Sequence, residues 1–149
     1  MTRDVDIVVM AAPEPGSALI DALLDDPGLY VPEAEGRRAI GDGGTFNVLH
    51  PASGGKVDIF AQPSSDGFTR SRLARRVRAD VLGVETWVAT PEDVVLAKLR
   101  WRLSSRSEIQ WRDCVEIAAA QPLDAAYLWA WAEPLGVAAD LAELLEALA

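Results

Sequence analysis

Two aspartates, one residue apart, introduce an apolar run near the start of the chain, in the sequence DVDIVV of residues 4–9. The apolar run predicts a buried strand over residues 4–10. Because side chains alternate between the two faces of a strand, Asp4 and Asp6 share one face. Two like charges side by side repel each other. The strand therefore requires either that both carboxylates face water or that a positive charge lies between them.

The composition narrows the class of protein. A chain of 149 residues that is half hydrophobic and a quarter charged is long enough to bury a core as one domain. Its formal net charge of -9 argues against non-specific attraction of the whole surface to nucleic acid or to an anionic membrane, although a local basic patch can still bind either. No stretch is typical of a signal peptide, a transit peptide or a membrane span, so we expect a cytoplasmic protein that does not enter a membrane.

Cysteine and histidine are too few for two common kinds of site. The single cysteine, Cys114, allows no intramolecular disulfide, which fits a reducing cytoplasm. Cys114 lies in an apolar helical run and is interpreted as a small buried hydrophobic residue rather than a reactive thiol. The single histidine, His50, excludes a multi-histidine zinc site within one chain and is interpreted as a surface or hydrogen-bonded residue rather than a general base.

The first half of the chain alternates strand and turn signals. After a break at Pro13 and Pro15, the pattern predicts a short helix over residues 17–24 with Ser17 as a candidate N-cap. A brief strand at Tyr30 and a weak helix over residues 33–40 follow. Strands are expected over residues 45–50, 56–60, 81–82 and 86–88, and an arginine-rich helix over residues 66–78.

The second half is helical. The sequence TPED, residues 90–93, is a strong helix start, because threonine can cap, proline suits the first turn and acids suit the positive helix end. Helices are predicted over residues 90–103, 108–120, 124–133 and 138–148. The expected fold class is α+β: a small mixed sheet with flanking helices in residues 1–89, followed by a helical part in residues 90–149, together forming one compact unit.

A third acid can join the first two. Asp58 lies in the sequence KVDIF, residues 56–60, between apolar neighbours. If this strand pairs beside the first, Asp58 converges with Asp4 and Asp6. Three carboxylates at one point suit Mg²⁺, which prefers hard oxygen ligands and is usually completed by substrate phosphates. The alternative is that these acids lie at strand ends in solvent.

These segments resemble the nucleotidyltransferase (polymerase-beta-like) superfamily. In that superfamily an Asp-x-Asp strand and a third acid on a neighbouring strand bind metal and a nucleoside triphosphate. The sequences TRDVDIVV (residues 2–9) and KVDIF match those two strands. The sequences TPEDVVLAKL (residues 90–99) and QWRD (residues 110–113) resemble bacterial nucleotidyltransferase-like proteins akin to the abortive-infection type IV toxins of toxin-antitoxin systems. The resemblance covers nearly the whole chain.

The resemblance implies an activity and a role for each matched residue. The chain would transfer a nucleotidyl group from a nucleoside triphosphate to an acceptor hydroxyl, with Mg²⁺ or Mn²⁺. Asp4, Asp6 and Asp58 would be the metal ligands, and Asp58 would also assist deprotonation of the acceptor. Lys98 would neutralise phosphate charge as a catalytic and nucleotide-binding residue, and Arg3 and Asp113 would complete the nucleotide site. The acceptor is left open among a tRNA, a protein and a small molecule, and a partner protein or a homodimer is also open.

One element of the superfamily is missing. A helix that ends in a Gly-Ser or Gly-Gly turn usually precedes the Asp-x-Asp strand, and its turn contacts the phosphates. This sequence begins at the aspartates, so three explanations stay open: a start site assigned too far downstream, a shortened chain, or lost catalysis. The last explanation gives a second hypothesis, a catalytically inactive binding or antitoxin-like module.

Other charged and aromatic residues have two interpretations each. Lys98 emerges from a mostly apolar helix face and either meets a phosphate or forms a structural ion pair. Asp113 and Arg112 either support the same cleft or lie on a solvated face, and Glu92 and Asp93 are most simply capping acids.

A cluster of basic residues also has two interpretations. It is either a solvated face or a binding site for phosphates, and it consists of Arg70, Arg72, Arg75, Arg76 and Arg78. No aromatic residue interleaves with it, so sequence-specific RNA reading is unsupported. The five tryptophans are expected in the core and between helices, with some available for a partner.

Overall fold

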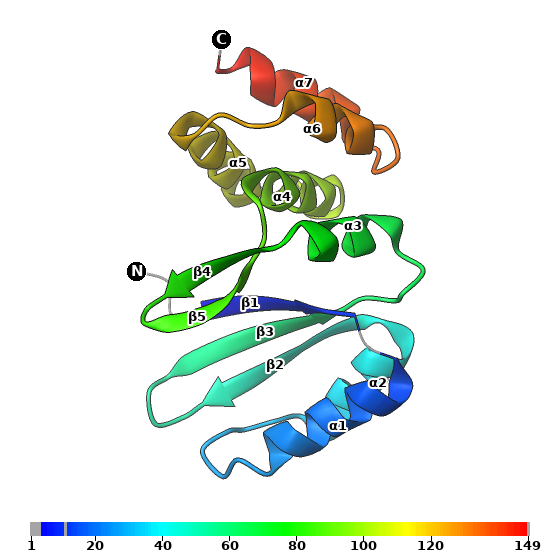
Figure 1. Ribbon diagram of the computed structural model, residues 1–149, viewed down its shortest axis with the longest axis vertical. Coiled ribbons are helices and arrows are strands. Elements are labelled where there is room, and N and C mark those ends of the chain that lie inside the picture. Colours follow the sequence, from blue (N-terminus) through cyan, green and yellow to red (C-terminus); the bar gives the residue numbers. More distant parts are fainter. Residues whose placement is uncertain (1–3, 11, 149) are drawn as a thin grey trace. The chain divides into compact units, whose positions relative to one another are not determined.

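A computed structural model of the protein describes residues 4–10 and 12–148. The described residues form seven helices and two small sheets, of three and two strands, which confirms the α+β class (Figure 1). The chain divides into two compact units, residues 1–70 and 71–149. The boundary between the two units lies within helix α3 (Gly67–Arg75). From the sequence we expected one compact unit with two parts that meet between residues 89 and 90. The difference arises because the second hairpin pairs with itself and forms a separate sheet.

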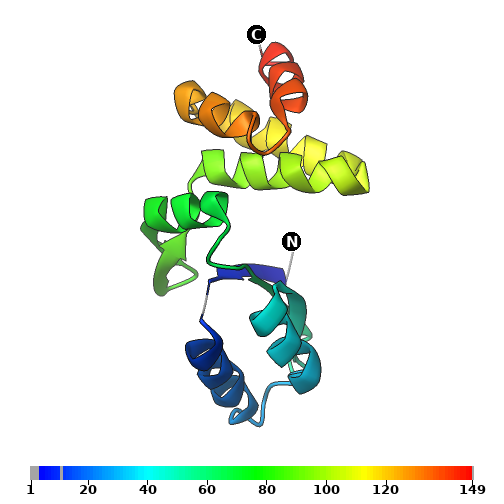
Figure 2. The same cartoon turned by 90° about the vertical axis from the view of Figure 1, so that its right-hand side faces the viewer.

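The first unit is a three-stranded mixed sheet with two helices. Its elements are β1 (Asp4–Val9), α1 (Pro13–Leu24), α2 (Glu33–Asp42), β2 (Gly44–His50) and β3 (Gly55–Ala61). The strand order is β1-β3-β2, with β1 parallel and β2 antiparallel to β3. Helices α1 and α2 lie side by side on one side of this sheet (Figure 2). The sheet edge at β2 is extended by a single bridge between Tyr30 and Leu49, where the sequence predicted a brief strand.

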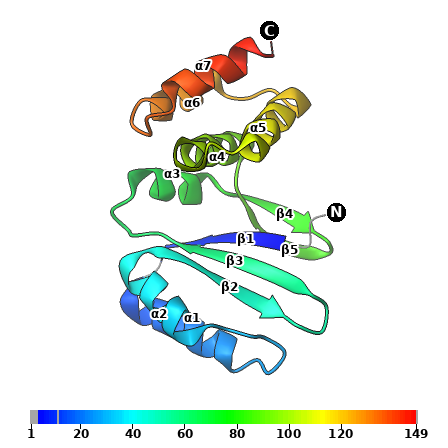
Figure 3. The same cartoon turned by 180° about the vertical axis from the view of Figure 1, so that it is seen from behind.

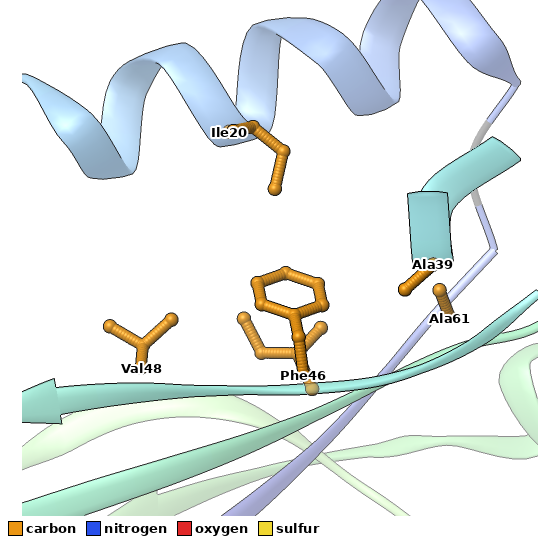
Figure 4. Packing of buried hydrophobic residues seen from close by; sticks show 6 residues of the cluster. Ile20, Ala39, Phe46, Val48 and Ala61 are labelled. Atoms are coloured by element: carbon orange, nitrogen blue, oxygen red, sulfur yellow. The ribbon is translucent and has the colours of Figure 1, made fainter. Parts of the chain in front are cut away.

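The core of the first unit lies between the sheet and the two helices. Alternating residues of β2 and β3 point toward the helices, as the period of two residues in a strand requires. Phe46 is opposite Ile59 in the register, and its ring lies beneath Ile20 of α1 (Figure 4). The buried cluster consists of Ile20, Ala39, Phe46, Val48, Ile59 and Ala61. Burial of this apolar face, rather than local helix propensity, accounts for most of the stability of α1 and α2.

The second unit begins within α3 and consists of a hairpin and four helices. The elements after α3 are β4 (Val77–Val81), β5 (Val84–Val88), α4 (Pro91–Ser105), α5 (Glu108–Ala120), α6 (Ala125–Ala132) and α7 (Ala138–Glu146). From behind, α4 and α5 lie next to each other, and α6 packs against α7 (Figure 3). Fully buried side chains such as Leu96, Leu99 and Leu141 form the helical core. The TPED helix start is confirmed, since Thr90 is the N-cap of α4 and its side chain accepts a hydrogen bond from Asp93 N at 3.4 Å.

Three expectations from the sequence are wrong. Helix α1 begins at Pro13, and Ser17 lies inside it instead of capping it. Proline is tolerated in a first helical turn, where its missing N–H needs no partner, so the prolines open the helix rather than precede it. Helix α3 ends at Arg75 because Val77 enters β4, opposite Val88. The tryptophans are not uniformly buried: Trp87, Trp101 and Trp129 are 52%, 49% and 43% exposed.

The close approach of α2 to the core gives a first prediction. A Cβ added at Gly36 would lie 2.8 Å from Ile20 Cδ1 and 3.4 Å from the Phe46 ring, whereas one at Gly41 would meet nothing within 4 Å. We expect Gly36→Val to lower the free energy of unfolding by about 1–3 kcal/mol through overpacking. The matched control Gly41→Val should change it by less than about 0.5 kcal/mol. Urea unfolding followed by circular dichroism measures both, and equal effects would show that α2 does not approach Ile20 this closely.

Candidate functional site

Two of the three predicted metal-binding acids lie next to each other in the sheet. Asp6 of β1 and Asp58 of β3 are Cα partners in parallel strands, as are Ile7 and Ile59 beside them. Ile59 belongs to the core that faces α1 and α2, so Asp6 and Asp58 point to the opposite face of the sheet. The Asp6 side chain is exposed, and the Asp58 side chain is only 19% exposed.

A third side chain with a polar oxygen lies in this row, and it was missed from the sequence. Asn47 of β2 is the Cα partner of Asp58 on its other side, so the row across the sheet reads Asp6, Asp58, Asn47. An amide oxygen is also a hard ligand that suits Mg²⁺ or Ca²⁺. The signal was present in the alternation of β2, where Asn47 lies between the inward-facing Phe46 and Val48. The register of β2 against β3, which the sequence left open, determines that Asn47 meets Asp58.

A lysine compensates the charge of Asp58. Lys56 Nζ lies 2.8 Å from Asp58 Oδ2, as expected for residues i and i+2 on one face of a strand. The sequence required either exposure or a nearby positive charge for Asp4 and Asp6. The Asp6 side chain is exposed, whereas the positive charge of Lys56 pairs with the third acid, Asp58. The other carboxylate oxygen, Asp58 Oδ1, is buried and has no hydrogen-bond partner in the described part of the chain. A buried acceptor without a partner is costly, so Oδ1 is a position where a cation or donor would stabilise the site.

The rest of the predicted metal and nucleotide site in the first unit is described only in part. Arg3 and the side chain of Asp4 lie outside the described residues. Among the residues that the structure does describe, no group of three or more His, Cys, Asp or Glu side chains is placed to hold a metal ion. The acids available for this purpose are therefore the pair Asp6 and Asp58.

The predicted site residues of the second unit also lie together. Lys98 of α4 donates hydrogen bonds to Asp113 Oδ2 at 2.7 Å and to Gln110 Oε1 at 3.1 Å, both on α5. The side chains of Lys98 and Asp113 are 25% and 32% exposed. Lys98 thus forms the ion pair that was one of its two interpretations. Arg112 lies on the exposed side of α5, with its Nε 3.8 Å from Glu116 Oε1.

The two acids in the first turn of α4, Glu92 and Asp93, also form hydrogen bonds to residues of other segments. The Asp93 side chain is fully buried and accepts hydrogen bonds from Tyr127 OH at 2.6 Å and from Thr90 Oγ1 at 2.8 Å. Glu92 Oε1 accepts from Asp124 N at 3.0 Å, where α6 begins. Burial alone would raise the pKa of Glu92, but the hydrogen bonds it accepts, including that from Asp124 N, hold it below its ordinary value. Asp93 and Glu92 therefore join the starts of α4 and α6.

One arginine of the basic cluster belongs to this same network. Arg75 Nε lies 3.5 Å from Asp93 Oδ2, Arg75 Nη2 lies 3.4 Å from Glu92 Oε2, and its guanidinium is 3.6 Å from the centroid of the Tyr127 ring. Burial raises the pKa of Tyr127, and the hydrogen bond to Asp93 raises it further. Arg75 is thus engaged in packing α3 against α4 and α6. The interpretation of the cluster as one phosphate dock does not apply to it.

His50 and Cys114, which were interpreted from the sequence as residues without a catalytic role, have the environments expected for them. His50 is exposed, and its Nδ1 lies 2.7 Å from Ser53 Oγ within the turn between β2 and β3. Cys114 is fully buried, and burial raises the pKa of its thiol to about 11. Its interpretation as a buried hydrophobic residue is confirmed.

No protein-family model matches the sequence, and the curated proteins give no match either. None of the helices in the described ranges has the length and apolar character needed to cross a membrane.

The burial of Cys114 predicts that it reacts only when the second unit opens. We expect a thiol reagent such as 5,5′-dithiobis(2-nitrobenzoic acid) to leave the native protein unmodified near neutral pH, because the thiolate is the nucleophile and the pKa is about 11. Absorbance after addition of urea should then report one thiol per chain. Rapid modification without urea would contradict this packing of α4 and α5.

The lowered pKa of Glu92 predicts an acid-dependent stability. A carboxyl group whose pKa is lower in the folded than in the unfolded chain stabilises the fold above its unfolded pKa, near 4.5. That contribution is lost as the pH falls through the folded pKa. We expect Glu92→Gln to flatten the fall of the urea midpoint with decreasing pH, whereas the exposed control Glu116→Gln should keep the wild-type slope. Identical slopes in all three proteins would refute a role for Glu92.

Proposed function

We propose that the protein is a magnesium-dependent nucleotidyltransferase with a nucleotidyltransferase-like fold. It would move a nucleotidyl group from a nucleoside triphosphate to an acceptor hydroxyl. The observation that carries the proposal is the parallel register of β1 and β3, which makes Asp6 and Asp58 neighbours on one face of the sheet. The resemblance requires this arrangement, in which an Asp-x-Asp strand runs beside a strand with a third acid.

The residues of the row fit a divalent cation. Asp58 Oδ1 is a buried acceptor without a partner among the described residues, and Asp6 and Asn47 would add oxygen ligands on either side of it. When bound, Mg²⁺ would neutralise the charge that develops on the transferring phosphoryl group. Asp6 and Asp58 would be its ligands together with Asp4, and Mn²⁺ would suit the same oxygens.

The chain's own residues would position and neutralise the reactants. Lys56 already compensates the charge of the Asp58 carboxylate, with its Nζ 2.8 Å from Asp58 Oδ2. Asp58 would also accept the proton of the acceptor hydroxyl. In the second unit, the ammonium of Lys98 would neutralise phosphate charge, with Asp113 holding it at 2.7 Å, and Arg3 would add to the nucleotide site. The roles of Lys98, Asp113 and Arg3 rest on the resemblance. The acceptor would be a tRNA, a protein or a small molecule, and the cytoplasmic location stays a prediction from the sequence.

A second candidate function is a binding module of the same fold without catalysis, as in a toxin-antitoxin pair. The Lys56–Asp58 ion pair favours it, because a lysine can compensate the acid permanently in place of a metal. A buried pair of this kind is retained in folded proteins without any catalytic role. The two candidates differ in whether a nucleoside triphosphate binds only with metal.

Calorimetric titration with nucleoside triphosphates, with and without Mg²⁺, tests the proposal. We expect wild-type binding to require Mg²⁺, and Asp58→Asn or Asp6→Asn to weaken it by more than about tenfold, because each removes a carboxylate ligand. Incorporation of label from an α-³²P-labelled triphosphate should be lost in both variants.

The matched control is Asp25→Asn, an exposed acid at the end of α1 whose loss should leave binding and transfer unchanged. Metal-independent binding, or none at all, would exclude the enzyme and favour the binding module. Full transfer by Asp58→Asn would exclude the metal site on this row.

A further inference from the structure

The β4–β5 hairpin has one face on which a tryptophan stands among charged residues. Arg78 is the Cα partner of Trp87, and Asp80 is the partner of Glu85, so these four side chains share a face. The other face carries Val77, Ala79, Val81, Val84, Thr86 and Val88. Trp87 is the apolar residue of the charged face, and 52% of it is exposed.

Two arginines lie against the Trp87 ring. The guanidinium carbon of Arg76 is 4.6 Å from the ring centroid, and that of Arg78 is 5.4 Å from it. Both distances are within the range of cation–π attraction. In the sequence no aromatic residue is interleaved with the arginine cluster, but the fold of the hairpin brings Trp87 next to two of its members.

Both arginines keep donors for an anion. Arg76 donates from Nη1 to the Leu73 carbonyl and otherwise contacts the ring, so most of its five N–H donors have no protein acceptor in the described part of the chain. Arg78 pairs with Glu85, but these side chains are 61% and 64% exposed. An ion pair in water contributes little, so a phosphate can replace Glu85 at small cost.

The two acids on this face of the hairpin, Asp80 and Glu85, do not prevent an anion from binding there. The Asp80 carboxylate accepts a hydrogen bond from Gly83 N at 2.9 Å and thereby caps the turn of the hairpin. Glu85 is compensated by Arg78. An apolar protein partner would need neighbours that exclude water around the tryptophan, and this face offers charged ones instead. A flat base attached to a charged backbone matches an exposed indole with flanking guanidinium groups.

We propose that this face, formed by Arg76, Arg78 and Trp87, binds single-stranded nucleic acid without sequence specificity. A base stacks on the exposed indole of Trp87, and the adjacent phosphates accept hydrogen bonds from Arg76 and Arg78. The binding does not rest on the proposed transfer reaction, and it requires neither a metal ion nor a nucleoside triphosphate. The overall charge of -9 confines the attraction to this local patch and makes it sensitive to salt.

Fluorescence anisotropy of labelled oligouridine and oligothymidine, each of about ten nucleotides, tests this site in low salt without metal. We expect Trp87→Ala to weaken binding by roughly 5- to 150-fold, the range for the loss of one stacked base. Trp87→Phe should retain part of the affinity. Arg76→Gln should lower the slope of log affinity against log salt by about 0.7, the value for one phosphate contact to a single strand. Tighter binding of oligouridine than of oligothymidine would identify RNA as the ligand, and equal binding would leave the site general for both.

Two controls separate the site from general effects. Trp129→Ala removes another exposed tryptophan, and Arg112→Gln removes another exposed arginine, so both should bind like wild type. Thermal unfolding of each variant checks the fold, and if Trp87→Ala unfolds, Trp87→Phe and Arg76→Gln decide the result. Absence of binding by the wild-type protein would overturn the proposal, as would equal affinity for duplex or variants indistinguishable from the controls. Failure of the transfer assay with intact oligonucleotide binding would count against the enzyme alone.

Discussion

The parallel pairing of β1 with β3 is the interaction on which the candidate site depends. A parallel connection cannot be made by a tight turn, so the chain between the two strands has to cross over the sheet. Helices α1 and α2 and the antiparallel strand β2 occupy that crossover, and they bury Ile20, Ala39 and Phe46 against one face. The opposite face carries the acid pair Asp6 and Asp58, together with apolar residues of the same strands such as Val8 and Phe60. The register between β1 and β3 therefore fixes both which residues face the helices and which acids lie side by side on the other face.

That register is strongly specified because of the alternation in each strand. A slip of β3 by one residue would turn Ile59 and Ala61 away from the helices and direct Asp58 toward the core. The cost of burying Asp58 would add to the loss of apolar burial. Strand β1 contributes less to this specification, because Val5 and Ile7 are 54% and 42% exposed rather than buried as the sequence predicted. Asp58 is tolerated at a mostly buried position because Lys56 lies 2.8 Å away on the same strand. Its second oxygen has no such partner in the part of the chain that the structure describes, and the proposed cation site rests on this atom.

The packing of helices in the second unit depends on a different interaction, the hydrogen bonds of a buried carboxylate at the start of α4. Asp93 is held by Thr90 and Tyr127, and Arg75 lies over the tyrosine ring. The network joins α3, α4 and α6 through polar contacts, while Leu96, Leu99 and Cys114 supply the apolar packing nearby. It also removes Arg75 from the basic cluster, which leaves Arg76 and Arg78 beside Trp87 on the hairpin. Three arginines that are close in the sequence are therefore divided between a buried network and the exposed hairpin.

The sequence by itself determined the α+β class, the TPED helix start, the strands at residues 45–50 and 56–60 and the burial of Cys114. Each of these follows from local physics: alternation in a strand, capping at a helix end, or the polarity of one side chain. Only the tertiary structure decided that β1 runs beside β3 and brings Asp6 next to Asp58, that Lys98 meets Asp113, and that Trp87 lies exposed beside two arginines. Those contacts depend on which strand or helix becomes the neighbour. A single sequence carries no local signal for that choice, because pairing is set by the burial of whole faces rather than by any one residue.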